Sequence, residues 1–263
     1  MKSYEVLRTI DSDFLQSKNL MRSKLSDDDL ERATDAHFKR MLTRRADGEF
    51  YDALTYRHRC MYAYLLKMVE IQFRPPSFNI DKKMIEFLDF CHGDMACIGG
   101  REVALARAYF EKGQRLGFFG KIQKKRDDLF DELSGMAWDL YHIRQLEENM
   151  TFKPSLQARY FFPALLTFDK RFIEIIDLYP LRSLAYKEGE HSPMPFYAGN
   201  WLELMGTTET GRQLAFRRFY STEAREERAS NRDTAKIRLE SIIDELTNSL
   251  SKLASIKPLS RGS

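Results

Sequence analysis

The sequence has few cysteines and no long apolar segment, and these two shortages exclude several classes of protein. Its three cysteines, Cys60, Cys91 and Cys97, cannot all pair with one another, and no two of them have the Cys-x-x-Cys spacing. Neither a disulfide framework nor a thiolate zinc site is therefore expected. No apolar run approaches the roughly 20 residues that span a bilayer, and the N-terminus lacks the basic and then apolar pattern of a signal peptide. We expect a soluble cytoplasmic protein that does not enter a membrane.

The sequence also lacks a large excess of either charge. Its 42 lysine and arginine residues nearly balance its 39 aspartate and glutamate residues, so the formal net charge is only +3. The global charge therefore gives no indication of a nucleic-acid or membrane partner, and any basic surface must be local. With 263 residues, of which 43% are hydrophobic, the chain has ample apolar content for a folded core.

The N-terminal part, residues 1–76, is expected to be helical. Ser26 is followed by three aspartates, which is typical of a helix start, because serine caps the first turn and carboxylates favour its positive end. A second helix is predicted from about Phe50 to Phe73, where large apolar residues recur at helical intervals. Pro75 and Pro76 interrupt this pattern, so we predict a boundary there.

The central part, residues 77–200, is predicted to be an α/β core with a parallel sheet. The apolar run Met84–Phe90 is too short for a stable helix of its own and is soon followed by glycines, which indicates a buried strand. Pro163 cannot donate to a central ladder, so a second strand is expected to begin there. The predicted order is strand, helix, helix, strand and helix, over residues 84–90, 101–111, 124–149, 164–168 and 170–179. This order is typical of α/β units with parallel strands.

The C-terminal part, residues 201–263, is predicted to be a helical addition to this core. Residues 210–255 read as one long helix or two, and apolar residues recur along residues 236–254 at the spacing of an amphipathic helix. This stripe is the expected contact surface for a second copy of the chain or for a regulatory partner.

Two acidic residues end the predicted strands. Asp89 closes the first apolar run and Asp169 the second, and in a parallel α/β sheet ligands bind beyond the carboxyl ends of the strands. Carboxylates brought together there repel each other, so a divalent cation between them is the usual compensation. Mg²⁺ or Mn²⁺ suits such oxygen ligands and activates water for phosphodiester hydrolysis. Glu132 and Asp139, two turns apart on the predicted helix 124–149, are expected to point the same way.

Three short motifs resemble the PIN-domain nucleases: "IEFLDF", "AWDLYHIR" and "LLTFDKRF", within about residues 83–182. The resemblance implies a parallel α/β sheet whose carboxylates bind one or two Mg²⁺ or Mn²⁺ ions and cut RNA, sometimes DNA. Carried over by position, it implies that Asp89, Asp139 and Asp169 are metal ligands. The second acid of the family, a glutamate on a helix after the first strand, has two candidates, and Glu132 is preferred over Glu102 because it shares a helix face with Asp139.

Each of these acidic residues also has a structural explanation. Asp169 is a preferred residue type for the N-cap of the helix predicted at 170–179. Asp89 would accept hydrogen bonds in the loop that follows it, and Asp139 would pair with Arg144 or with a lysine of another helix. Glu132 alone would be a solvated helix residue. Only the combination of the four acids favours a nuclease.

The substrate prediction depends on residues 101–126, which hold eight lysine or arginine residues and two glutamates. Tyr109, Phe118 and Phe119 interleave with these charges, as in surfaces that follow phosphates and stack bases. A solvated helix with aromatic residues in the core explains the same composition. Candidate phosphate contacts are Lys125, Lys170 and Arg171.

The leading hypothesis from the sequence is a metal-dependent endoribonuclease, with RNA favoured over DNA, whose site consists of Asp89, Glu132, Asp139 and Asp169. The rival hypothesis is a helical adaptor or regulatory protein without catalysis, in which the same carboxylates are helix caps and ion pairs. A third hypothesis is a nucleic-acid binder with a degenerate site, which would bind in a salt-sensitive way without turnover.

Overall fold

Two compact units make up the chain. The computed structural model describes residues 2–75, 79–149, 165, 167–185 and 194–256. Unit 1 comprises Met1–Tyr56 and unit 2 comprises Arg57–Ser263, so the division lies inside helix α4 (Gly48–Phe73). Both divisions predicted from the sequence, after residues 76 and 200, fall within unit 2 and stay predictions.

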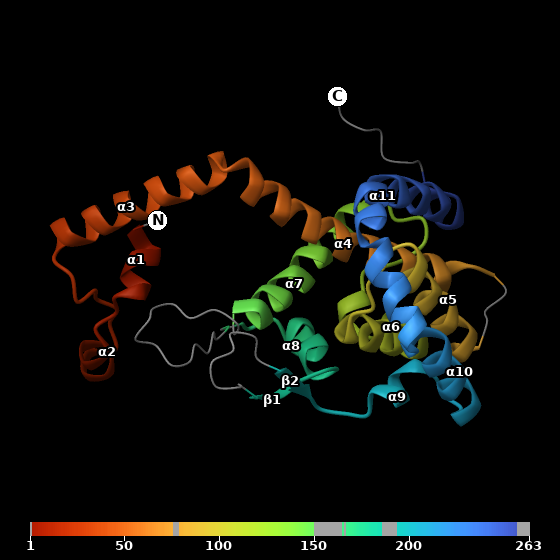
Figure 1. Ribbon diagram of the computed structural model, residues 1–263. Coiled ribbons are helices and arrows are strands. Elements are labelled where there is room, and N and C mark those ends of the chain that lie inside the picture. The colour runs from red at the N-terminus through yellow and green to blue at the C-terminus, as the bar shows by residue number, and fades with distance from the viewer. Residues whose placement is uncertain (1, 76–78, 150–164, 166, 186–193, 257–263) are drawn as a thin grey trace. The chain divides into compact units, whose positions relative to one another are not determined.

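Unit 1 consists of three helices and the first turns of α4 (Figure 1). The helices are α1 (Lys2–Arg8), α2 (Ser12–Lys18) and α3 (Asp27–Ala46). The Ser26 side chain accepts a hydrogen bond from the backbone N–H of Asp29, so the expected N-cap of α3 is confirmed. Helix α1 packs on α3 at His37, whose Nδ1 lies 3.2 Å from the buried carboxylate of Glu5.

The described residues of unit 2 that lie in regular elements are helical apart from one small sheet (Figure 1). It contains the rest of α4, then α5 (Ile80–Gly93), α6 (Gly100–Lys112), the 3₁₀ turns η1 (Gly113–Arg115) and η2 (Gly117–Phe119), α7 (Leu129–Asn149), α8 (Lys170–Asp177), β1 (Leu181–Ala185), β2 (Met194–Tyr197), α9 (Trp201–Met205), α10 (Glu209–Tyr220) and α11 (Thr222–Ala254). In the described part of the chain the only sheet is the antiparallel pair β1 and β2. The predicted parallel α/β core of the PIN type is therefore wrong.

The first predicted strand, residues 84–90, is the middle of helix α5. Met84, Phe87, Leu88 and Cys91 are all buried, and their spacing of three and four residues is that of one helix face. The helix begins before the apolar run, since the side chain of Asn79 accepts a hydrogen bond from the backbone N–H of Lys82. The charged first turn was left out of the sequence interpretation, and the remaining apolar residues were too few to show the helical period.

The second predicted strand, residues 164–168, lies partly outside the described residues. Leu165, Thr167 and Phe168 are described, and none of them belongs to a strand. The three helices predicted around this strand are confirmed as α6, α7 and α8, although α7 begins later than expected. Three helices of the central part were thus predicted from the sequence, whereas α5 and the observed sheet were not.

The described residues of the C-terminal part form the short helix α9 and two longer helices, α10 and α11, which meet at Ser221. Most of the apolar stripe predicted for residues 236–254 is buried in unit 2, including Ile242, Leu246 and Leu250. Ile237 is the exception, since 83% of it is exposed. The stripe therefore stabilises unit 2 itself, and a partner at this helix stays a prediction. None of the helices in the described ranges is long and apolar enough to cross a membrane.

Candidate functional site

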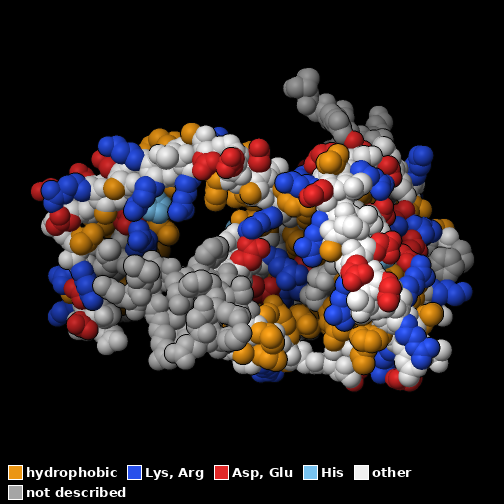
Figure 2. All heavy atoms as spheres, in the orientation of Figure 1, with side chains coloured by type: hydrophobic (Ala, Val, Ile, Leu, Met, Phe, Trp, Pro, Cys, Tyr) orange, Lys and Arg blue, Asp and Glu red, His pale blue; other side chains and the backbone are white. Residues whose placement is uncertain are grey.

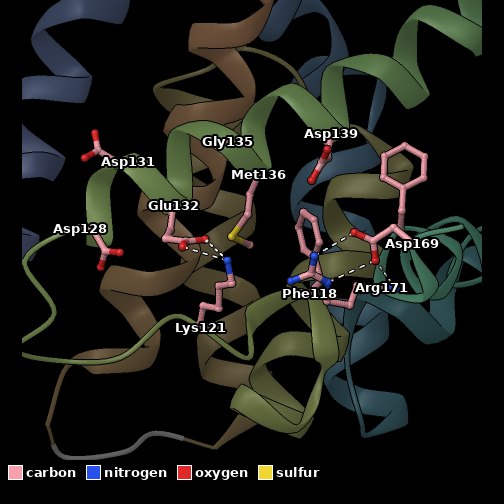
Figure 3. A pocket seen from close by; sticks show the side chains of 11 residues that line it. Phe118, Lys121, Asp128, Asp131, Glu132, Gly135, Met136, Asp139, Asp169 and Arg171 are labelled. Atoms are coloured by element: carbon pink, nitrogen blue, oxygen red, sulfur yellow. Dashed lines mark hydrogen bonds and ion pairs between the residues drawn. The ribbon is translucent and has the colours of Figure 1, made fainter. Parts of the chain in front are cut away.

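A cleft of about 410 Å³ in unit 2 brings together three of the four acids predicted from the sequence (Figure 3). Its walls are the turn η2 and the loop after it, the first half of α7, and the N-terminus of α8. Glu132 and Asp139 come from α7, and Asp169 precedes α8. The lining residues are Phe118, Lys121, Asp128, Asp131, Glu132, Gly135, Met136, Asp139, Asp169, Arg171 and Phe172.

Glu132 is held by two cations at one end of the cleft. The Lys121 Nζ lies 3.0 Å from the Glu132 Oε1, and the Arg126 Nη2 lies 3.2 Å from the same oxygen. Both pairs are partly open to solvent, where such ion pairs contribute little stability. The carboxylate of Glu132 is thus neutralised by neighbours from the loop before α7.

Asp169 has the structural role that the sequence left open, because it is the N-cap of α8. Its Oδ1 accepts a hydrogen bond of 2.9 Å from the backbone N–H of Arg171, and its Oδ2 lies 2.9 Å from the Arg171 guanidinium. The hydrogen bonds from Arg171, first that of its side chain, lower the pKa of Asp169 below its usual value. Asp169 is therefore an ionised helix cap at the edge of the cleft.

Asp139 is a partly buried acid of the cleft, and it forms no ion pair with any residue in the described ranges. Figure 3 shows its side chain on α7 pointing toward Arg171 and Asp169. Burial raises the pKa of Asp139, and the negative charge of Asp169 raises it further, while His142 and Arg171 act in the opposite direction. The net result is a carboxyl group whose pKa lies above its usual value.

Replacing Asp169 by asparagine should lower the pKa of Asp139. The change removes the repelling charge and frees Arg171, and asparagine can still cap α8. The measurement is a ¹³C NMR titration of the Asp139 carboxyl carbon in both proteins, with Asp127→Asn, on the exposed loop before α7, as the control. An unchanged pKa of Asp139 in Asp169→Asn would show that Asp169 does not act on it.

The same pKa shift predicts the effect of Asp139 on stability. Because folding raises the pKa of Asp139, the folded state binds the proton more tightly, and ionisation near neutral pH disfavours folding. Asp139→Asn should therefore be at least as stable as the wild type at about pH 7. The advantage should disappear as the pH falls through the raised pKa of Asp139 toward the usual aspartate value, because both side chains are then neutral. Urea unfolding at several pH values measures this difference.

Asp89 and Glu102, the remaining acid candidates, do not line this cleft. Asp89 lies on α5, where its Oδ1 forms an ion pair with Arg218 of α10. Glu102 on α6 is buried and forms an ion pair with Arg144 of α7. Asp89 was placed with the other acids because α5 was taken for a strand, so the error in the fold produced the error in its position.

The described residues do not fit a metal centre. Within the described ranges, no group of three or more histidine, cysteine, aspartate or glutamate side chains is arranged to hold a metal ion. Glu132 and Asp169 already have cationic partners, and Asp89 lies elsewhere. The Mg²⁺ or Mn²⁺ inferred from the sequence therefore stays a prediction.

Four of the eight basic residues of the stretch 101–126 form ion pairs within the chain. Ion pairs join Arg101 to Glu147, Arg107 to Glu111, Lys121 to Glu132 and Arg126 to Asp128. The three aromatic residues of the stretch, Tyr109, Phe118 and Phe119, are buried. Buried rings cannot stack on bases, so the alternative explanation, aromatic residues in the core, describes this stretch. A nucleic-acid partner stays a prediction.

A second surface, in unit 1, was not singled out from the sequence. Phe38, Met41 and Leu42, on the second half of α3, are 50%, 51% and 50% exposed, and we call them the α3 apolar segment. Figure 2 shows apolar side chains in orange among charged ones over the helices of unit 1. Met41 and Leu42 follow Phe38 by three and four residues, which places the α3 apolar segment on one side of the helix. This spacing is a signal that the sequence contains.

Comparisons of the chain with protein-family models, with curated proteins and with solved structures found no match. The first motif of the PIN resemblance, "IEFLDF", lies in helix α5, and the described residues of the third precede and form helix α8. The second motif, in α7, is helical as the resemblance implied. The functional argument therefore depends on the geometry of the cleft and of α3.

Proposed function

We propose that the protein is a helical interaction protein that binds a macromolecular partner through unit 1. The observation that supports this proposal is the half-exposed α3 apolar segment, Phe38, Met41 and Leu42. Large apolar side chains that are adjacent on one helix, and exposed together, are characteristic of surfaces that another protein covers.

The length of α1 explains why this part of α3 is uncovered. Helix α1 has 7 residues, about 10 Å, whereas α3 has 20 residues, about 30 Å. Every residue from Phe38 to Tyr51 is exposed, and this range includes the end of α3 and the first turn of α4. Isolated helical segments shorter than about 12–15 residues are marginal in water, and most helical stability comes from packing an apolar face. A partner on this segment would supply that packing.

Site-specific photo-crosslinking in living cells tests the proposal. A photoreactive phenylalanine analogue at Leu42 should give a covalent adduct of higher mass, and mass spectrometry of the adduct identifies the partner. The same analogue at Arg40, two residues away and on the other side of α3, is the matched control. Equal labelling at the two positions, or none at either, would contradict an interface at Leu42.

Hydrolysis of nucleic acid in the cleft, the leading hypothesis from the sequence, is the second candidate function. The observation that favours it is that Glu132, Asp139 and Asp169 all line one cleft. Under this hypothesis, purified protein with Mg²⁺ or Mn²⁺ should cleave single-stranded RNA, and Asp139→Asn should abolish the cleavage. Asp89→Asn is the matched control and should keep it, since Asp89 lies outside the cleft. Absence of cleavage of both RNA and DNA by the wild type would remove this candidate.

A further inference from the structure

We infer that the partner of α3 is a second copy of this chain, bound antiparallel to the first in a two-fold symmetric pair. The inference rests on the proposed function, because it names the partner of the same exposed segment. The surface involved is a row of four residues, Asp35, Phe38, Leu42 and Arg45, which we call the α3 row.

The spacing within the α3 row is that of helices that pair side by side. Successive members are separated by three, four and three residues, so they occupy the a and d positions of a heptad pattern and lie along one line of the helix. Helix α1 contacts another side of α3 at His37, and it reaches the face of the α3 row only at Glu31, one turn before the row begins, through an ion pair with Lys2. A second helix can therefore lie along the α3 row without displacing α1.

Most charges of α3 are divided by sign between its two halves, and Arg32, which pairs with Asp29, is the one basic residue of the first half. The acidic residues of the first half are Asp27, Asp28, Asp29, Glu31 and Asp35, and the basic residues of the second half are Lys39, Arg40, Arg44 and Arg45. Asp35 and Arg45 form no ion pair with any residue in the described ranges. A helix with an acidic first half and a basic second half is complementary to itself when two copies run in opposite directions.

The α3 row fixes the register of the pair. With the two-fold axis near Arg40, Phe38 of one copy faces Leu42 of the other, and Asp35 faces Arg45 of the other. Two apolar layers therefore lie at the centre, and one ion pair closes the row at each end. A parallel pair would instead place Asp35 against Asp35 and Arg45 against Arg45. Like charges in direct opposition disfavour that arrangement.

Sedimentation velocity of the full chain tests this inference. An interface of two short helices belongs to the weak class, so we expect a dimer with a dissociation constant on the order of 10–100 µM. Asp35→Arg and Arg45→Asp each create two pairs of like charges in the dimer, one at each end of the row. Each substitution should weaken dimerisation about tenfold or more. Arg40→Asp makes the same charge change as Arg45→Asp on the opposite side of the helix, and should leave dimerisation within about twofold.

Mixing the two charge-reversed proteins is the decisive step. In a mixed pair, the arginine at position 35 faces the aspartate at position 45, and the unchanged Arg45 faces the unchanged Asp35. An equimolar mixture of Asp35→Arg and Arg45→Asp should therefore dimerise again, although each protein alone does not. Far-UV circular dichroism of each variant checks that its helices are intact.

The outcomes separate this inference from the proposed function. A wild-type chain that stays monomeric at about 200 µM, or a mixture that fails to dimerise, overturns the second copy as partner. If Leu42 then cross-links to a different protein in cells, the proposed function stands. If the photoreactive group at Leu42 instead labels only its own monomer, or nothing, both are overturned.

Discussion

Replacing Glu102 by leucine should lower the free energy of unfolding by about 3–5 kcal/mol, because the change leaves a partly buried cation without its buried counter-charge. Glu102 on α6 is 1% exposed, and its Oε1 accepts a hydrogen bond of 3.0 Å from the Arg144 Nε of α7. The second Glu102 oxygen pairs with the Arg144 Nη2. Arg144 retains Glu147 as a partner at 3.1 Å, so we expect a loss near the lower end of this range.

A double-mutant cycle distinguishes a charge effect from a simple loss of packing. Replacing both partners, Glu102→Leu with Arg144→Met, should recover much of the loss, since a buried ion pair is often replaced by apolar side chains at little net cost. Glu111→Leu is the matched control on α6, where the exposed pair with Arg107 should contribute no more than about 1 kcal/mol. Urea unfolding measures all four proteins. A double variant as unstable as the sum of the single ones would contradict the explanation.

Helix positions could be predicted from this sequence wherever the apolar period extends over several turns. Ser26 and its following aspartates marked the start of α3, and Pro75 marked the end of α4. Helix α5 was missed because its apolar side chains, taken without the charged turn before them, match a short buried strand equally well. That single ambiguity changed the fold class, since the parallel sheet was inferred from two strands that the described residues do not contain.

The grouping of the acids could be predicted only where it depended on helix geometry. Glu132 and Asp139 line the same cleft because both lie on α7, seven residues apart. Asp89 was grouped with them through a sheet, a tertiary arrangement that no local pattern determines. Arg101 shows the same limit, because its charge indicated a solvated or substrate-binding surface, whereas it is buried against partners 46 or more residues away in the sequence.

The α3 apolar segment is a different case. Its helical spacing can be seen in the sequence, whereas its exposure to solvent cannot. Phe38, Met41 and Leu42 have the spacing of a core face, and composition alone would place them inside. Helix α1 is too short to cover the whole of α3, and its ion pairs with α3 involve Glu31 and His37, outside this segment. A half-exposed core-like face is therefore a property of the fold, and it is the reason for expecting a partner there.

Replacing Arg101 by methionine should also lower the free energy of unfolding by about 3–5 kcal/mol, because it leaves Glu147 and several carbonyl groups without a donor. Arg101 on α6 is 3% exposed. Its Nη2 lies 2.6 Å from the Glu147 Oε1 and donates to the Tyr179 carbonyl at 3.0 Å, while its Nη1 donates to the Ile175 and Ile176 carbonyls. These carbonyls belong to the last turn of α8 and the residues after it, which helix geometry leaves without partners of their own.

The loss should be concentrated at α8, which distinguishes it from a general weakening of the core. The chain has two tryptophans. Trp201 packs edge-on against Tyr179, with 6.1 Å between the ring centroids. Trp138, on α7, stacks on His58. In a Trp138→Phe background, Arg101→Met should shift the Trp201 fluorescence at denaturant concentrations below those of global unfolding. In a Trp201→Phe background, the Trp138 fluorescence should change only with global unfolding. Lys112→Met, at the exposed end of α6, is the matched control. Simultaneous changes in the fluorescence of both tryptophans would contradict a local role for Arg101.

A selective change at Trp201 would also predict a lower pKa for Asp139, because displacing α8 moves Asp169 away from Asp139.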